Sequence, residues 1–199
     1  MKPLNQLNII LASASPRRLS ILQEHGLNAI AMPANIEEIH CAGEDVQTYV
    51  TRLAKEKAQK IVSQNCPGSP DVIIAADTVV ALHNHILEKP KDRQDAFRML
   101  SMLSGVSHEV YTGYALVYLP DLRVHVDYAL TKITFHSLTD EQINDYIKTG
   151  DPFDKSGSYG IQNVFGSFVK EIKGSRFNVM GLPIEDILKK LTQHYSYLN

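Results

Sequence analysis

Two adjacent arginines follow two serines and a proline close to the N-terminus, in residues 11–18 (LASASPRR). The proline suits the first position of a helix, because its φ is fixed and it has no N–H to leave unpaired. We expect the hydroxyl of Ser15 to cap this helix, and Ser13 lies two residues before it. Arg17 and Arg18 then oppose the helix dipole unless a negative charge offsets them. The segment therefore predicts a binding site for a polyanion such as phosphate. An ordinary connection from a strand through a loop to a helix contains similar residues, however.

A carboxylate follows an uninterrupted apolar run. Residues 72–76 contain no polar side chain, as in a strand buried on both faces, and Asp77 and Thr78 come directly after them. Because open α/β sheets bind ligands at the ends of their strands, Asp77 stands where a ligand would bind. The Thr78 hydroxyl could contact the same ligand. A structural cap is the alternative interpretation of this aspartate.

Two lysines occupy notable positions in the sequence. Residues 45–63 predict a helix, and Lys57 falls on its apolar stripe rather than on its polar face. Lys89 precedes a proline, which holds the backbone extended and can direct the amine into a cleft. By itself, the run around Lys89 is also compatible with a solvated group of charges.

A glycine-rich segment supplies a fourth group. Residues 154–162 (DKSGSYGIQ) combine small residues, which let a ligand approach backbone amides, with the positive charge of Lys155. Gln162 at its end offers a donor and an acceptor on one planar edge. The chain has neither Walker spacing nor a GxGxxG motif at the start of a helix, which argues against P-loop and dinucleotide-binding classes.

The elements that must position these residues alternate between strands and helices. Strands are expected at about 7–11, 72–76 and 79–82, and a long hairpin at 111–119 and 122–135. Helices are expected at about 16–24, 45–63, 92–104, 139–149 and from 183 onward. This order predicts the α/β class, with a mixed twisted sheet, flanking helices and two lobes around a central cleft. No linker separates the lobes, so residues 1–199 are expected to form a single domain.

The composition of the chain limits which partners the protein can bind and indicates the cellular compartment in which it is found. The formal charge of −2, from 20 basic and 22 acidic residues, excludes a broadly basic nucleic-acid-binding surface. No apolar stretch approaches the roughly 20 residues that cross a bilayer, and the N-terminus makes a poor signal peptide. Cys41 and Cys66 match no metal spacing and predict reduced, passive thiols. We therefore expect a cytoplasmic protein with no membrane or nucleic-acid partner.

In order and spacing, these motifs resemble one family over nearly the whole chain: the Maf proteins, which are nucleoside triphosphate pyrophosphatases. The resemblance is carried by LASASPRR, RLAKEKA around Lys57, AADTVV at Asp77, the EKP run at Lys89, SGVSHEVYTG, DKSGSYGIQ and GLP at 181–183. It implies a Maf/ITPase-like fold. It also implies hydrolysis between the α and β phosphates, giving the monophosphate and pyrophosphate, with Mg²⁺ or Mn²⁺ as cofactor.

The resemblance extends to individual residues. Asp77 matches the family's proposed general base, and Arg17, Thr78 and Gln162 match the positions that look like the dTTP/UTP subgroup. A triphosphate carries about four negative charges, so hydrolysis requires their neutralisation by cations and a metal. Glu38 is the expected additional carboxylate near that metal. The expected substrate-binding residues are Ser13, Ser15, Arg17, Arg18, Lys57, Thr78, Lys89, Lys155 and Gln162.

Two other functions remain open at this point. A nucleotide-sensing regulator of cell division would keep the pocket without turnover, although an intact Asp77 argues against it. A pyrophosphatase of another nucleotide, such as 7-methyl-GTP, would be expected to carry an aromatic residue in place of Arg17. The partner in each case is a small nucleotide. A homodimer is compatible with the long hairpin, whose edge could pair with a second copy.

Overall fold

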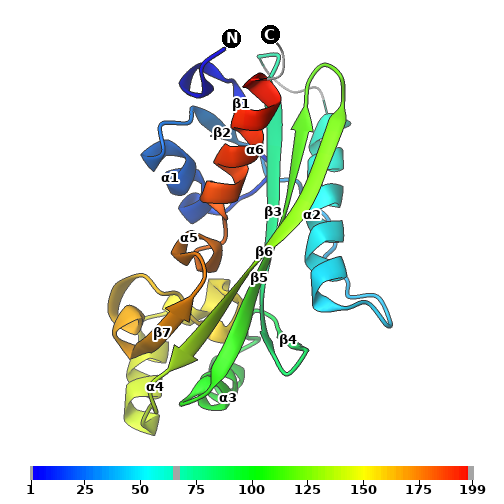
Figure 1. The fold of residues 1–199 in the computed structure, drawn as a ribbon. Coiled ribbons are helices and arrows are strands. Elements are labelled where there is room, and N and C mark those ends of the chain that lie inside the picture. The colour runs from blue at the N-terminus through cyan, green and yellow to red at the C-terminus, as the bar shows by residue number, and fades with distance from the viewer. Residues whose placement is uncertain (1, 65–67, 197–199) are drawn as a thin grey trace. The chain divides into compact units, whose positions relative to one another are not determined.

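The computed structural model describes residues 2–64 and 68–196, which divide into two compact units. The first unit comprises Met1–Asp77, Thr112–Tyr128 and Gly181–Asn199, and the second comprises Thr78–Tyr111 and Ala129–Met180. Each unit is therefore assembled from stretches that are distant in sequence. Figure 1 shows the order of elements along the chain by colour. Whether residues 1–199 form one domain stays a prediction.

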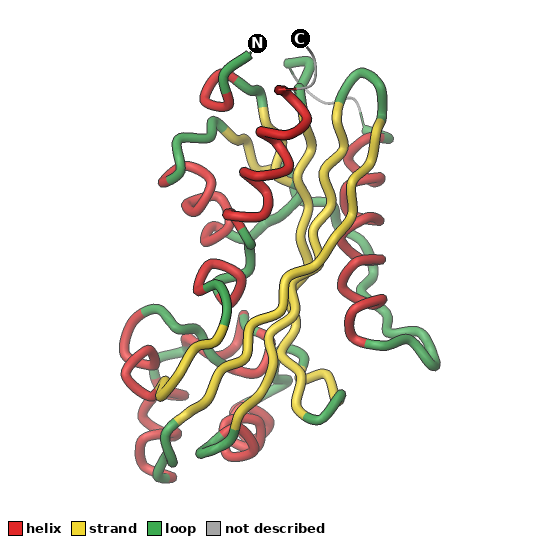
Figure 2. Tube along the Cα trace, in the orientation of Figure 1, coloured by secondary structure: helices red, strands yellow, loops and turns green. Residues whose placement is uncertain are grey.

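The strands form a mixed sheet in the order β2-β1-β3-β5-β6-β7, with β4 paired to β3. β1 pairs in parallel with β2 and β3, whereas β3–β4 and β6–β7 are antiparallel. Figure 2 shows these strands with helices beside them, which confirms the predicted α/β class. The strand bounds are β1 Ile9–Leu11, β2 Ala29–Ala31, β3 Val72–Leu82, β4 His85–Leu87, β5 Ser107–Tyr118, β6 Arg123–Phe135 and β7 Val169–Lys173.

Two predicted strands differ in the structure. The runs at 72–76 and 79–82 form one continuous strand, β3, so Asp77 lies inside a strand rather than after its end. Ala76 before it and Val79 beyond it are buried and apolar, and Thr78 is a residue type that favours strands, so the strand continues through the acid. Near the C-terminus, a 3-10 helix over Asn163–Phe168 precedes the last strand, β7.

Helices of the first unit begin and end close to the expected residues. They are α1 Pro16–Glu24, α2 Val46–Val62 and α6 Ile184–Ser196, preceded by the 3-10 helix Leu4–Gln6. Asp45 caps α2 by accepting a hydrogen bond from the Thr48 amide. Figure 1 shows α1 and α6 on one face of β1 and β3, and α2 on the opposite face.

The core beneath α2 explains how this helix is placed. Ala54, Ala58 and Ile61 of α2 pack with Ile73 and Ala75 of β3 in one buried apolar cluster. The backbone of β5 also approaches α2 closely: a Cβ added at Gly113 would lie 2.3 Å from the Val50 carbonyl. Glycine is therefore required at that point. The small residues bring α2 close enough for its longer side chains to reach β3 residues on the same face.

The second unit has its own core and its own helices. These are α3 Arg93–Leu103, α4 Asp140–Lys148, α5 Arg176–Val179 and the 3-10 helices Asp151–Asp154 and Ser156–Ser158. Side chains cap two of these helices: Asp92 accepts a hydrogen bond from the Asp95 amide, and Thr139 and Gln142 form a capping box. Its core includes Val80, Leu100, Phe135, Ile147 and Tyr159. None of the helices in the described residues is long and apolar enough to cross a membrane.

Candidate active site

The turn between β1 and α1 places the N-terminal serines differently from the sequence prediction. Ser15 occupies the N-cap position of α1, but its side chain makes no capping hydrogen bond, so that expectation is wrong. The Ser13 hydroxyl is instead the acceptor, and it receives a hydrogen bond from the Ser15 amide at 3.2 Å. Ser13 is buried, whereas Ser15 is only partly buried. Ser13 therefore organises this turn.

Arg18 is held at the same turn by two acceptors. Its Nη1 donates to the Ser13 Oγ at 3.1 Å, and its Nε donates to the Gly181 carbonyl at 2.7 Å. Burial lowers the pKa of Arg18, and the charges of Asp77 and Glu38 act in the opposite direction. The protein thus supplies negative charge to the first turn of α1 without any ligand. Arg17, the next residue toward the helix start, opposes them by lowering the pKa of Arg18.

Asp77, Lys57 and Glu38 form one ionic group in the first unit. The Lys57 Nζ lies 2.6 Å from Asp77 Oδ1 and 2.6 Å from Glu38 Oε1. The side chains of Lys57 and Asp77 are 12% and 8% exposed, whereas that of Glu38 is 43% exposed. Because water screens a buried pair weakly, the contact between Lys57 and Asp77 is the stronger of the two.

The alternation of β3 explains why Asp77 meets Lys57. Ile73 and Ala75 pack under α2, and Asp77 is the next residue on that face because side chains of a strand alternate. Lys57 lies on α2 between Ala54 and Ala58, which belong to the same cluster. An apolar residue at this helical position would cover Asp77 and leave a buried charge unpaired, at a cost of several kcal/mol.

The two carboxylates are suited to a divalent cation that arrives with a phosphate ligand. Within the described ranges, no three His, Cys, Asp or Glu side chains gather where they could hold a metal ion. Mg²⁺, however, is usually bound by one or two carboxylates, with substrate phosphates and waters as the other ligands. Glu38 and Asp77 already converge on one positive centre, the Lys57 ammonium. The donor set therefore fits Mg²⁺ or Mn²⁺ in the presence of a nucleotide.

The remaining predicted residues belong to the second unit. Thr78 follows Asp77 in β3 and is partly buried, whereas Lys89 is exposed in the segment after β4. Gln162 is partly buried and precedes the 3-10 helix Asn163–Phe168. The Ser156 hydroxyl accepts from the Val80 amide at 2.8 Å and donates to the Leu87 carbonyl at 2.5 Å. These bonds tie the glycine-rich segment to β3 and β4.

Lys155 is enclosed by acceptors in the same unit. Its Nζ contacts Asp151 Oδ1 at 2.9 Å and Asp154 Oδ1 at 2.6 Å, and it donates to the Asp151 carbonyl at 2.5 Å. Tyr146 donates to the other Asp151 oxygen at 2.5 Å. A Cβ added at Gly160 would lie 2.8 Å from the Lys155 Cε, so the glycine makes room for the lysine stem. The amine is therefore oriented by neighbours that the sequence did not single out.

Comparison with protein families decides the classification. The model of the family described as "Maf-like protein" matches residues 8–194, which is most of the chain. The chain belongs to the Maf family.

Curated Maf relatives match over nearly their whole lengths. A protein named "dTTP/UTP pyrophosphatase" from Koribacter versatilis (strain Ellin345) is 44% identical over 185 residues, which cover 93% of each chain. One with the same name from Clostridioides difficile (strain 630) is 45% identical over 187 residues, covering 92% of this chain and 95% of the relative. The Maf resemblance expected from the motifs is thus confirmed.

A solved structure confirms the expected kind of fold. The Staphylococcus aureus Ham1 protein superimposes with a TM-score of 0.52 at 12% sequence identity, covering 94% of this Maf chain and 99% of that chain. At this identity the likeness concerns the fold alone.

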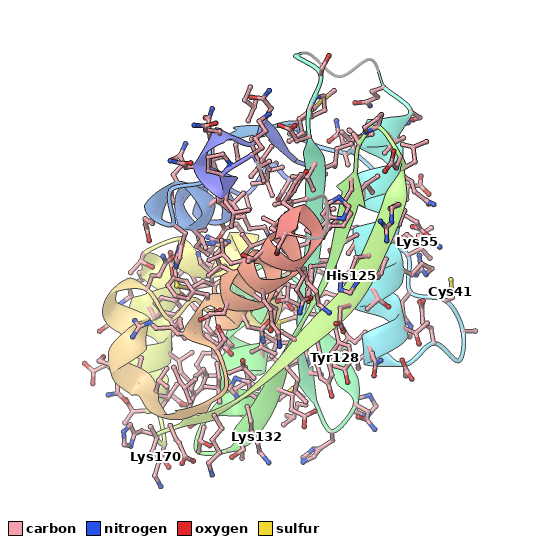
Figure 3. The ribbon with its side chains drawn as sticks, turned by 45° about the horizontal axis from the view of Figure 1, so that its top comes forward. Cys41, Lys55, His125, Tyr128, Lys132 and Lys170 are labelled. Atoms are coloured by element: carbon pink, nitrogen blue, oxygen red, sulfur yellow. The ribbon has the colours of Figure 1, made fainter. Side chains whose placement is uncertain are left out.

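Sequence reasoning missed several residues that hold the candidate site residues in place. Tyr146 and Asp151 hold Lys155, and the Gly181 carbonyl holds Arg18. Tyr146 falls on an expected helix and Asp151 in a polar loop, so only their spatial neighbours give them this role. Gly181 belongs to the GLP motif, which the resemblance included without assigning a task to it. Cys41 is an exposed free thiol, seen in Figure 3, and Cys66 lies outside the described residues.

Proposed function

We propose that this chain hydrolyses nucleoside triphosphates between the α and β phosphates, with dTTP and UTP preferred, releasing the monophosphate and pyrophosphate. The observation that carries the proposal is the convergence of Asp77 and Glu38 on the Lys57 ammonium, 2.6 Å from each. Arg18 lies within electrostatic reach of both carboxylates. Such a group can bind a highly charged anion together with a cation and keep a carboxylate beside the reacting phosphorus. Curated Maf relatives named "dTTP/UTP pyrophosphatase" support the same reaction.

Each residue of the first unit has a proposed part in the reaction. Arg18 and Lys57 bind phosphate oxygens and offset their charge, and Ser13 orients Arg18 through its hydroxyl. Asp77 orients the attacking water and accepts its proton. Glu38 and Asp77 would hold a divalent cation, which supplies charge neutralisation and acidifies water when it is bound. Ser15 and Arg17 are proposed to contact the same phosphates.

Residues of the second unit are proposed to recognise the nucleotide. Lys89 and Lys155 supply further positive charge for the phosphates. The amide of Gln162 would pair with O4 and N3–H of thymine or uracil, which present an acceptor and a donor side by side. Arg17, Thr78 and Gln162 together match the pattern that looks like the dTTP/UTP subgroup. A preference for these two substrates, and for modified pyrimidines related to them, follows from that pattern.

A panel assay tests the function directly. Pyrophosphate release is measured from dTTP, UTP, CTP, ATP, GTP and 7-methyl-GTP with Mg²⁺ or Mn²⁺, for the wild type and for Asp77→Asn. We expect release from dTTP and UTP, reduced by about 10²- to 10⁴-fold in the variant. Asparagine keeps the shape of the residue and can still accept a hydrogen bond from Lys57, so a loss of rate with nucleotide binding retained isolates the carboxylate charge.

The same assay separates the alternatives. Release from 7-methyl-GTP in preference to dTTP would assign the chain to a different Maf substrate class. Tight nucleotide binding without release from any substrate would favour a sensor. Wild-type rates in Asp77→Asn would remove Asp77 from the reaction. A homodimer is a further proposal, tested by light scattering of the purified chain.

A further inference from the structure

Arg52 of α2 makes a two-point contact with the carboxylate of Glu44. Its Nε donates to Glu44 Oε1 at 2.7 Å and its Nη2 donates to Oε2 at 2.8 Å. The Glu44 side chain is only 6% exposed, which distinguishes this pair from ordinary surface ion pairs. The hydrogen bond from Arg52 lowers the pKa of Glu44 despite the opposing effect of burial. The contact is therefore a two-point ion pair whose carboxylate is largely shielded from water.

The same guanidinium reaches the backbone of the 33–45 loop beside Glu38. Arg52 Nη2 donates to the Ile39 carbonyl at 2.8 Å, and the Tyr49 hydroxyl donates to the Glu38 carbonyl at 3.3 Å. Two successive carbonyls of the loop are thus held from one helix. Arg52 Nη1 also donates to Glu56 Oε1 at 3.1 Å, which fixes the remaining edge of the fork.

Glu44 closes the loop from its other end. Its carboxylate accepts from the Cys41 amide at 3.2 Å, and its carbonyl accepts from His40 Nε2 at 2.9 Å. Between these anchors the side chain of Glu38 is 43% exposed, and yet it reaches Lys57 at 2.6 Å. The backbone anchors hold the loop from which this exposed side chain extends to Lys57.

We propose that Arg52 and Glu44 are positioning residues that hold Glu38 for divalent-cation binding. The inference rests on the proposed function only in taking Glu38 as a ligand of the cation. Arg52 and Glu44 do not contact Asp77 or Lys57 in any described interaction of the 2–64 and 68–196 ranges. They act through the loop backbone, so that replacing either residue would change the position of the Glu38 carboxylate.

The effect of Arg52 and Glu44 on Glu38 can be tested by measuring Mn²⁺ binding, which requires no catalytic turnover. Mn²⁺ affinity of the nucleotide-free, full-length protein is obtained from the electron paramagnetic resonance signal of the free ion. We expect Arg52→Gln and Glu44→Gln each to weaken Mn²⁺ binding by about tenfold, the lower end for residues that orient metal ligands. Arg52→Lys keeps the positive charge but loses the two-point contact of the guanidinium with Glu44, so we expect an intermediate loss of Mn²⁺ affinity.

Two controls make the result specific. Arg98→Gln removes another helical arginine, one that donates to Asp95 Oδ1 at 2.6 Å in the second unit, and should leave Mn²⁺ affinity unchanged. In a Glu38→Gln background, Arg52→Gln should have no further effect on Mn²⁺ affinity, because the ligand that it positions is already absent. If Arg52→Gln fails to fold, Glu44→Gln and Arg52→Lys carry the same test.

The outcomes separate this inference from the proposed activity. Unchanged Mn²⁺ affinity in folded Arg52→Gln, or an equal loss in the Glu38→Gln background, would overturn the positioning role. Weakened Mn²⁺ binding that depends on Glu38 would support it even if the protein released no pyrophosphate from any nucleotide. Pyrophosphate release with normal Mg²⁺ dependence in Arg52→Gln would overturn it while leaving the proposed activity intact.

Discussion

The Lys57 ammonium and the Asp77 carboxylate lie 2.6 Å apart, with side chains that are 12% and 8% exposed. The same ammonium contacts Glu38, so one lysine bridges the two carboxylates that are suited to hold a cation. A divalent cation and Lys57 would therefore compete for the same oxygens. A triphosphate offers the displaced ammonium new partners, which couples cation binding to nucleotide binding through Lys57.

Lys57→Met should strengthen Mn²⁺ binding to the nucleotide-free protein while abolishing turnover. Removing the competing charge leaves Asp77 and Glu38 without a cation, and we expect about tenfold tighter Mn²⁺ binding, or about 1.4 kcal/mol. The melting temperature without metal should fall, because a buried carboxylate loses its partner, and added Mn²⁺ should restore part of it. Calorimetric Mn²⁺ titration with and without dTTP checks the coupling. Weaker Mn²⁺ binding in the variant would contradict the competition.

Arg18→Lys should raise the KM for dTTP by about tenfold with a smaller effect on kcat. A lysine cannot donate at once to the Ser13 hydroxyl and the Gly181 carbonyl while presenting a flat guanidinium edge to a phosphate. Ser13→Ala is the matched variant, since it removes only one of the two acceptors that orient Arg18. Steady-state kinetics on both variants provide the measurement. An unchanged KM in Arg18→Lys would mean that Arg18 is structural.

Gln162→Glu should erode the preference for thymine and uracil. A carboxylate keeps the acceptor but loses the amide donor, so the O4 atom of the base loses its partner. We expect the ratio of kcat/KM for dTTP over GTP to fall by about tenfold, and further when Arg17 is replaced by an aromatic residue. Competition between nucleotide pairs measures this ratio. The same selectivity in both variants would remove these residues from base recognition.

His108 should make the free energy of unfolding depend on pH. Burial lowers its pKa from 6.5 to about 4, and its Nε2 hydrogen bonds to the Tyr159 hydroxyl at 2.7 Å inside the core of the second unit. Because the unfolded chain binds the proton more readily, this contribution is complete above about pH 6.5 and is lost as the pH falls toward 4. The loss is on the order of 3 kcal/mol. Denaturant unfolding of His108→Gln should show a flatter pH dependence over that range, and an unchanged slope would exclude His108 as its source.

The N-terminal arginines show how far local sequence reasoning reaches. The proline and the bounds of α1 were predictable, because helix-start and helix-end preferences act over a few residues, whereas the capping hydrogen bond expected of Ser15 does not form. The offsetting charge for Arg18 was not, because Asp77 and Glu38 approach it only in the folded chain. The prediction that a ligand must supply this charge missed these carboxylates for that reason.

Asp77 illustrates the other limit. The sequence shows an apolar run followed by this aspartate, which predicted that the strand ends there, but in the structure the strand continues through Asp77. Strand ends depend on pairing with neighbouring strands, which a single segment does not reveal. Lys57 on the apolar stripe of α2 was the signal that a buried acid faced the helix.

The sequence by itself determined the α/β class, most helix boundaries, the family motifs and the chemical types available for phosphate binding, since each depends on local preference or on the order of short motifs. The tertiary structure alone decided which groups meet: Lys57 with both carboxylates, Arg52 with the loop that bears Glu38, and Lys155 with Asp151. These contacts join residues through the packing of α2 on β3 and of the second unit's core. Side-chain distances of this kind follow from packing, which a linear pattern does not contain.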